Sequence, residues 1–156
     1  MTAPHASDTG VLFDSALLAG GAHAVDTTVV PLRSDEHVVY LRKLVRERAL
    51  EMKLSLVDQT KLVTAASELA RNTIKYGGGG SALVHKLADG PRCGVRLVFA
   101  DDGPGIADLK LALTDGYTTG GGLGLGLSGS KRLVDEFDID TRPGEGTAVC
   151  ITKWKR

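Results

Sequence analysis

The sequence is poor in aromatic residues, in cysteine and in net charge. Phe, Trp and Tyr make up 4% of its 156 residues, and Lys+Arg and Asp+Glu both number 19. A formal net charge of zero argues against partners that bind through bulk charge, such as nucleic acid or an anionic membrane. The two cysteines, Cys93 and Cys150, form no CxxC pair and have no histidines at metal-ligand spacing. We therefore expect two reduced thiols in a cytoplasmic protein rather than a disulfide or a metal site.

Long hydrophobic runs are also missing. No apolar stretch approaches the ~20 residues that span a bilayer. Residues 11–24 are largely apolar and end in an A-x-A pattern, but no Lys or Arg precedes them, Asp8 lies just before them and Asp14 interrupts them, which excludes a signal peptide. We expect residues 1–24 to form a flexible tail and residues 25–156 to form one domain. Four apolar side chains of the tail are available for docking elsewhere: Leu12, Phe13, Leu17 and Leu18.

Glycine, by contrast, is abundant. The chain has 20 glycines, and all but Gly10, Gly20 and Gly21 lie beyond Tyr76. Five prolines and no three-residue period exclude a collagen-like chain. Glycines gathered in clusters indicate places where the backbone approaches a ligand or another segment closely.

Leaving out a short helix at residues 106–113, hydrophobic periodicity predicts the order β-α-α-β-β-α-β-β. Pro31 suggests that the first strand, residues 26–33, lies at a sheet edge. Ser34 is placed to cap the first helix, and Ser55 with Asp58 forms a capping box at the start of the second. The second helix is expected to bury a stripe formed by Leu62, Ala66, Leu69, Ala70 and Thr73. It ends at a run of glycines, residues 77–80. The later elements are strands at 82–87 and 94–100, a short helix at 106–113, a loop at 115–122, a helix at 127–137, and strands at 138–141 and 147–153. Early helices followed by hairpins favour a two-layer α+β sandwich.

The second helix also carries a polar stripe. Glu68, Asn72 and Lys75 are spaced i, i+4 and i+7, so they share one side of the helix. A carboxylate and an amide one turn apart suit a general base and a magnesium ligand. Taken alone, the stripe is explained more simply as a solvated helix face.

One glycine-rich segment follows a predicted strand, and a second precedes a predicted helix. Residues 101–105, Asp-Asp-Gly-Pro-Gly, suit recognition of a nucleobase or sugar, and equally suit a tight turn. Residues 120–127 run into a helix start, where backbone N–H groups can bind phosphate, and a flexible loop is the alternative. A Walker A motif fails there because Ser130 precedes Lys131, and the GxGxxG match at residues 124–129 lacks a surrounding βαβ unit. Residues 142–147 alone read as a hairpin turn.

Together, however, the order of these motifs resembles the GHKL ATPase superfamily. ExxxN, DxGxG, GxGxGL and GxGT occupy residues 68–72, 101–105, 122–127 and 144–147. Further segments make the sequence similar to the RsbT-type anti-sigma regulatory serine/threonine kinases. These segments are residues 55–60, 67–72, 115–119 and 131–137, and the similarity covers about residues 26–156. The resemblance implies a Bergerat-type sandwich, with helices on one face of a mixed, mostly antiparallel sheet. Leu125 departs from the small residue that such proteins often carry between the glycines.

The resemblance implies an ATP site with Mg²⁺. The Asp101 position would bind the adenine amino group, with Thr147 near the adenine. Asn72 would hold Mg²⁺, and Glu68 would orient or deprotonate the substrate hydroxyl. Lys75 would add positive charge near the phosphates. The remaining positions that the resemblance assigns to the nucleotide are Gly103, Gly105, Ile106, Thr118, Thr119, Gly122, Gly124, Gly126 and Leu127.

The resemblance further implies a protein substrate and a change of partner. The phosphate acceptor would be a serine or threonine of a STAS-domain protein in a stress-response pathway, and the released kinase would then activate a downstream phosphatase. A basic helix face offers a partner surface, although a solvated face explains it as well: Arg42, Lys43 and Arg46. The alternatives are an anti-sigma factor that binds a sigma factor with little catalysis, a histidine-kinase catalytic domain, for which we expect no room for a phosphoacceptor helix and a sensor, and a fragment of a larger ATPase.

Overall fold

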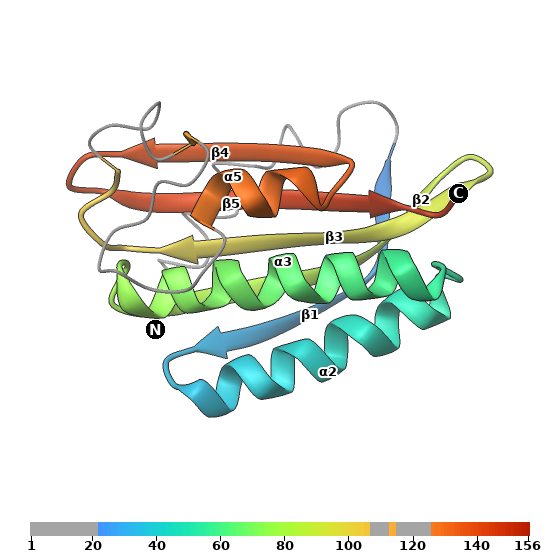
Figure 1. Ribbon diagram of the computed structural model, residues 1–156, viewed down its shortest axis with the longest axis horizontal. Helices are drawn as coiled ribbons and strands as arrows, with labels where there is room; N and C mark the ends of the chain where they lie inside the picture. The colour runs from blue at the N-terminus through green and yellow to red at the C-terminus, as the bar shows by residue number, and fades with distance from the viewer. Residues whose placement is uncertain (1–21, 107–112, 115–125) are drawn as a thin grey trace.

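The computed structural model describes residues 22–106, 113–114 and 126–156. In these residues, three helices cover one face of a five-stranded sheet (Figure 1). The elements in chain order are β1 (His23–Leu32), α2 (Asp35–Glu51), α3 (Leu56–Lys75), β2 (Gly80–Asp89), β3 (Arg92–Asp101), α5 (Gly126–Arg132), β4 (Glu136–Arg142) and β5 (Gly146–Trp154). The predicted order of strands and helices and the two-layer sandwich are confirmed.

The strands lie in the order β1-β2-β3-β5-β4, and all pairings among them are antiparallel. The described sheet therefore lacks the parallel pair that a mixed sheet would contain. β1 is an edge strand, as Pro31 predicts, since proline cannot donate a hydrogen bond to a second neighbour. β5, the last strand along the described chain, lies between β3 and β4 and is therefore an interior strand of the sheet.

The two long helices begin where their caps predict. Ser34 is the N-cap residue of α2, with Asp35 and Glu36 in the first turn, where acidic side chains favour the helix dipole. The Ser55 hydroxyl accepts a hydrogen bond from the Asp58 N–H at 3.1 Å and so caps α3. The predicted stripe of α3 is buried in full: Leu62, Ala66, Leu69, Ala70 and Thr73.

The main core lies between the helices and the inner face of the sheet. Val95, Leu97 and Phe99 of β3 alternate towards α3, and Val149 and Ile151 of β5 join them. All five side chains are buried in one cluster with the apolar stripes of α2 and α3. This packing fixes α3 across the centre of the sheet (Figure 1).

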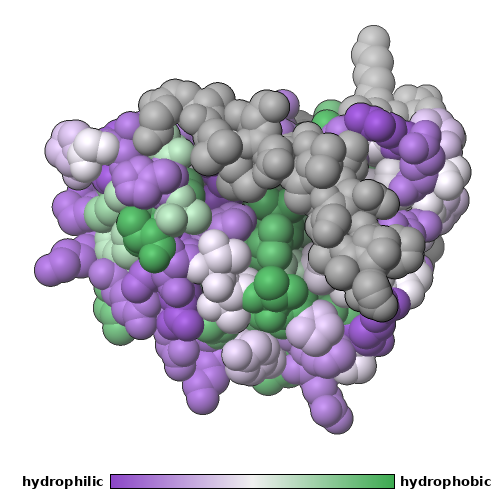
Figure 2. Space-filling model, turned by 180° about the vertical axis from the view of Figure 1, so that it is seen from behind, coloured by the Kyte–Doolittle hydropathy of each residue, from purple (hydrophilic) through white to green (hydrophobic). Residues whose placement is uncertain are grey.

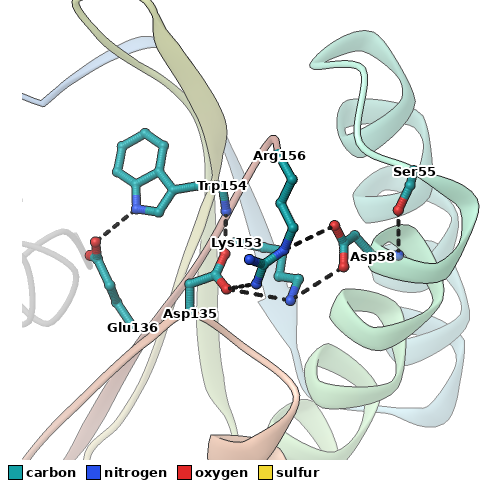
Figure 3. Close-up of polar contacts among 7 residues, drawn as sticks. All are labelled: Ser55, Asp58, Asp135, Glu136, Lys153, Trp154 and Arg156. Atoms are coloured by element: carbon teal, nitrogen blue, oxygen red, sulfur yellow. Dashed lines mark hydrogen bonds and ion pairs between the residues drawn. The ribbon is translucent and has the colours of Figure 1, made fainter.

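A charged network fastens the first turn of α3 to the end of β5 (Figure 3). The Lys153 ammonium lies 3.4 Å from Asp58 Oδ1 and 3.5 Å from Asp135 Oδ1, and its side chain is 3% exposed. Arg156 Nη2 lies 2.6 Å from the same Asp135 oxygen. The Trp154 N–H donates to Asp135 Oδ2 at 2.7 Å. Each buried charge in this anchor therefore has an opposite charge beside it.

The C-terminal boundary predicted for the helix at residues 127–137 is wrong. α5 ends at Arg132, and Phe137 belongs to β4. Phe137 and Ile139 pack on the core while Asp138 between them is exposed, which is the two-residue alternation of a strand. The predicted strand at 138–141 is correspondingly longer in the structure.

Other predictions meet the structure in part. β1 begins at His23, inside the segment expected to be the tail. Cys93 and Cys150 are free thiols, as expected. The loop at 115–122 lies outside the described residues, as does the short helix at 106–113 apart from its two end residues. Among the helices that the structure describes, none is long and apolar enough to cross a membrane.

Candidate functional site

The polar stripe of α3 divides into two pairs. Glu68 and Asn72 are half-buried, whereas Arg71 and Lys75 are exposed. No described residue forms a side-chain hydrogen bond or ion pair with Glu68 or Asn72. Lys75 Nζ lies 5.2 Å from the centre of the Tyr76 ring, a surface cation–π contact. A solvated helix face therefore accounts for Arg71 and Lys75 but not for Glu68 and Asn72.

Asp101 is the last residue of β3 and is half-buried on the side of the sheet that faces α3. Its Oδ1 accepts hydrogen bonds from the Gly103 N–H at 2.8 Å and the Thr147 N–H at 3.3 Å. Burial raises the pKa of Asp101, and the nearby Asp102 charge adds to this, although the two N–H groups oppose it. Oδ2 has no hydrogen-bond partner among the described residues. Asp101 thus presents one free, partly desolvated carboxylate oxygen.

Glycines bring the end of α3 against this carboxylate. A Cβ atom on Gly77 would lie 2.3 Å from Asp101 Cγ, and one on Gly103 would lie 2.7 Å from Gly77 Cα. These distances are too short for real side-chain contacts, so the three segments meet only because both residues are glycine. Sequence reasoning assigned Gly77 only to ending the helix. The run of four glycines, longer than a helix stop needs, was the available signal.

Hydrogen bonds join the loop after β3 to the β4–β5 hairpin. The Gly144 N–H donates to the Pro104 carbonyl at 2.8 Å, and the Ile106 N–H donates to Thr141 Oγ1 at 2.8 Å. The hydroxyls of Thr141 and Thr147 lie 2.9 Å apart. The hairpin turn at residues 142–147, whose GxGT motif the resemblance assigns to the nucleotide site, therefore forms one wall around Asp101. Thr141 was missed by sequence reasoning, since nothing local distinguishes it from any strand threonine.

Two further glycines allow this wall to close. Gly146 has a φ of 113°, and a Cβ there would lie 2.2 Å from the Asp101 carbonyl oxygen. Gly105 has a φ of 78°, and a Cβ there would lie 2.6 Å from the Arg142 carbonyl oxygen. A side chain at either position would meet both backbone strain and a steric clash.

The third described helix, α5, packs on α3. α5 begins at Gly126, which has a φ of 71°, and Leu127 is buried in the main core. α5 packs on α3, so the predicted end of the glycine-rich loop reaches the helix that carries Glu68 and Asn72. Four of the residues assigned to the nucleotide lie outside the described residues: Thr118, Thr119, Gly122 and Gly124.

These groups fit a nucleotide with a divalent cation. Asp101 Oδ2 can accept a hydrogen bond from an amino group, and the glycines keep side chains away from it. The described residues hold no cluster of three metal-ligating side chains. A cation here would rely on the Asn72 amide oxygen, with ligand phosphates and water completing its coordination, which is the pattern that Mg²⁺ accepts.

Comparisons with known proteins agree with this geometry. Residues 57–156 match the family described as histidine kinase-, DNA gyrase B- and HSP90-like ATPases. The serine/threonine-protein kinase RsbT of Bacillus subtilis is 41% identical over 131 residues, which cover 84% of this chain and 98% of RsbT. An anti-sigma F factor of a Thermoanaerobacter species is 25% identical over 129 residues, covering 79% of this chain and 89% of that protein.

A solved structure has the same fold. The RsbU and RsbW domains of Rv1364c from Mycobacterium tuberculosis match with a TM-score of 0.57 and 18% identity, covering 85% of this chain and 33% of that one. This chain thus spans a third of the solved one, and the likeness at that identity concerns the fold alone. From the matched residues, the RsbT relative and the site geometry, we conclude that the chain belongs to the GHKL ATPase family and, within it, to the RsbT-type serine/threonine-protein kinases.

Proposed function

We propose that this protein is an ATP-dependent serine/threonine kinase of a stress-response partner-switching pathway, located in the cytoplasm, and that its substrate is a STAS-domain protein. The observation that carries the proposal is the half-buried pair Glu68 and Asn72, which has no partner among the described residues and lies on the helix that meets Asp101 through Gly77. The relationship to RsbT supports the reaction class.

The nucleotide would bind at the end of β3. Asp101 Oδ2 would accept a hydrogen bond from the adenine amino group while Oδ1 stays bonded to the Gly103 and Thr147 N–H groups. The adenine would lie against the glycine-lined loop and the hairpin, in contact with Gly105, Ile106 and Thr147. The phosphates would be held by the segment ending at α5, through Thr118, Thr119, Gly122, Gly124, Gly126 and Leu127.

The chemistry would take place along α3. Asn72 would bind Mg²⁺ together with the phosphates, and Lys75 would add positive charge near them. Glu68 would accept the proton of a serine or threonine hydroxyl as its oxygen attacks the γ-phosphorus. The bond from that phosphorus to the bridging oxygen breaks, and ADP leaves. Phosphoryl transfer depends mainly on positioning and charge neutralisation, so a carboxylate of ordinary basicity is adequate.

The helical layer offers a surface for the protein substrate. A shallow hollow of about 430 Å³ lies between α2 and α3, with an apolar floor that includes Val63 and a basic rim of Arg42, Lys43 and Arg46. Val39 and Leu50 at its border are 67% and 64% exposed. We propose that the STAS-domain protein docks here before phosphorylation, and that a downstream phosphatase binds the kinase after its release.

A transfer assay tests the function. The purified chain, a purified STAS-domain protein and ATP labelled on the γ-phosphate should give a labelled serine or threonine. Glu68→Gln should lower the transfer rate by about 10²–10⁴-fold, the usual contribution of a positioned base, while ATP binding persists. Glu36→Gln, at the exposed start of α2, is the matched control and should transfer normally.

A second function is favoured by the relationship to anti-sigma F factors. In that case the chain would bind a sigma factor in a nucleotide-dependent way with little or no catalysis. The same preparation distinguishes the two. Tight binding to a sigma factor without labelling of the STAS-domain protein would replace the kinase proposal.

A further inference from the structure

The face of the sheet that points away from the helices carries two rows of side chains. Directly paired residues of antiparallel strands project from the same face, so the pairing registers define these rows. Both rows cross all five strands: Val29, Leu83, Val98, Cys150 and Asp138 in the first, and Thr27, His85, Arg96, Thr152 and Glu136 in the second. Figure 2, seen from behind, shows a hydrophobic strip near the middle of this side, with more hydrophilic atoms to its left and below it.

The centre of this outer face is buried. Val98 and Cys150 are 1% and 3% exposed, and Arg96 beside them is 5% exposed. At the edge of the first row, Val29 is 58% exposed. The described helices lie on the opposite face, so none of them can account for this burial (Figure 1). Something other than the described helices and strands therefore covers β3 and β5 and leaves β1 open.

The polar row is arranged for a dry environment. Arg96 donates to Thr152 Oγ1 at 2.7 Å and to Glu136 Oε1 at 3.0 Å. The Trp154 indole N–H donates to the other Glu136 oxygen at 2.7 Å. Burial is also the main cause that lowers the pKa of His85. A charged side chain this buried normally has paired hydrogen bonds, which Arg96 has, so water is excluded at the centre of the second row, while Thr27 and the Glu136 side chain at its ends stay exposed.

The chain enters this face immediately before β1. Ala22 is buried together with Leu87 of β2 and Trp154 of β5, both of which project to the outer face. Leu18 lies four residues before Ala22, a stretch that spans at most about 14 Å. Along β5, Trp154 and Cys150 are also four residues apart, which is about 13 Å. Residues just before Ala22 can therefore reach the first row without a long connection.

We propose that the N-terminal segment of this chain packs on the outer face of the sheet through Leu12, Phe13, Leu17 and Leu18, and covers Val98 and Cys150. These four side chains are the large apolar residues nearest to β1 in sequence, and they match an apolar centre formed by Leu83, Val98, Ala148 and Cys150. The cover leaves α2, α3 and the end of β3 accessible. The segment thus closes one side of the molecule and directs protein partners to the other.

The buried thiol provides a direct test in the full chain. In a Cys93→Ser background, Cys150 is the single thiol, and its burial raises its pKa to about 12, so it should react slowly with a maleimide. Replacing Leu12, Phe13, Leu17 and Leu18 together by Ser should accelerate labelling at least about tenfold, because exposure restores thiolate formation. The matched control, His5→Ser with Asp8→Ser and Thr9→Ser, should leave the rate unchanged. An unchanged rate in the four-serine variant, with circular dichroism showing it folded, would overturn the proposal.

Cross-linking removes the dependence on that variant's stability. Single cysteines at positions 12, 13, 17 and 18, each in the Cys93→Ser background, are oxidised mildly and examined for a disulfide with Cys150. A disulfide requires Cα atoms about 4.4–6.8 Å apart, so at least one position should form it within a monomer, and a cysteine at Thr2 should not. Disulfides only between two chains would assign the cover to a second copy. That result, or no disulfide at any of the four positions, would overturn the proposal.

Discussion

The two ends of α3 are built on opposite principles. At the first turn, Asp58 is 6% exposed and lies against Lys153, so its charge is satisfied inside the protein (Figure 3). In the last turns, Glu68 and Asn72 are half-buried with no side-chain partner among the described residues, and Asp101 Oδ2, beyond Gly77, accepts no hydrogen bond from them either. Half-buried polar groups without a protein partner remain available to water or to a ligand. The comparison indicates that the first turn, which we call the closed end, holds the helix in place. The last turns, which we call the open end, are left available to a ligand.

The largest expected effect is at the closed end. Lys153→Met removes the ammonium between Asp58 and Asp135. The buried Asp58 carboxylate is then left with Arg156 Nε at 3.7 Å, while Asp135 keeps Arg156 Nη2 at 2.6 Å. We expect a loss of about 3–5 kcal/mol in the free energy of unfolding, measured by urea denaturation. Lys155→Met, an exposed neighbour, is the control and should change little. ATP affinity of the folded protein should stay the same; if it fell with stability, the two ends would not be separate in function.

At the open end, Asp101→Asn should weaken ATP binding by about tenfold to a hundredfold, the value of one hydrogen bond to a charged group. The fold should persist, because the amide oxygen can still accept from the Gly103 N–H. Calorimetric titration with ATP measures the change, and Asp102→Asn, at an exposed neighbour, should leave affinity intact. An unchanged affinity in Asp101→Asn would end the assignment of this pocket to the nucleotide.

Gly77→Ala should lower ATP affinity by about tenfold, since overpacking of this kind costs about 1–3 kcal/mol and falls on the Asp101 side chain. Gly78→Ala is the matched control. A Cβ there meets nothing within 4 Å, but Gly78 has a φ of 74°, so the variant should lose stability without losing affinity. Equal loss of affinity in both variants would mean that the loop responds to backbone strain rather than to contact with Asp101.

The smallest expected effect is on stability and again concerns the closed end of α3. Ser55→Ala removes the cap of α3 and should cost about 1 kcal/mol of stability, measured as the shift in unfolding free energy. Ser34→Ala at the start of α2 should cost less, because Ser34 makes no side-chain hydrogen bond there. Neither variant should alter ATP binding, so a change in affinity with Ser55→Ala would show that the first turn of α3 communicates with the last.

The fold was largely predictable because its signals are local. The caps at Ser34 and Ser55, the buried stripe from Leu62 to Thr73 and the edge proline at 31 each depend on a few neighbouring residues. The error at residues 133–137 also has a local cause. Leu133, Val134 and Phe137 have helical spacing, but pairing of Phe137 with Ile151 of β5 makes it part of a strand. No residue near Phe137 in sequence reveals that pairing.

Residues of the candidate site were predictable only where they belong to the motifs whose order along the sequence resembles that of the GHKL ATPases. Glu68, Asn72 and Asp101 were predicted as site residues from spacing and resemblance, and the structure brings α3 and the end of β3 together through Gly77. Thr141 was not found, because its importance lies in its bonds to Ile106 and Thr147, which are distant from it or separated by a turn. Similarly, the packing of α5 on α3 was not predictable, because α5 lies more than 50 residues after α3 in the sequence.

The central position of β5 has a consequence for how the protein is made. β5 pairs with both β3 and β4, and its Thr147 N–H completes the hydrogen bonds of Asp101. While the ribosome is still adding residues 146–154, β3 has an unpaired edge and the pocket lacks a wall. At the proposed nucleotide site, a nascent chain therefore lacks one wall until this strand emerges, and until then it exposes an aggregation-prone sheet edge. Release of the last strand from the ribosome thus sets the earliest moment at which the proposed site can be complete.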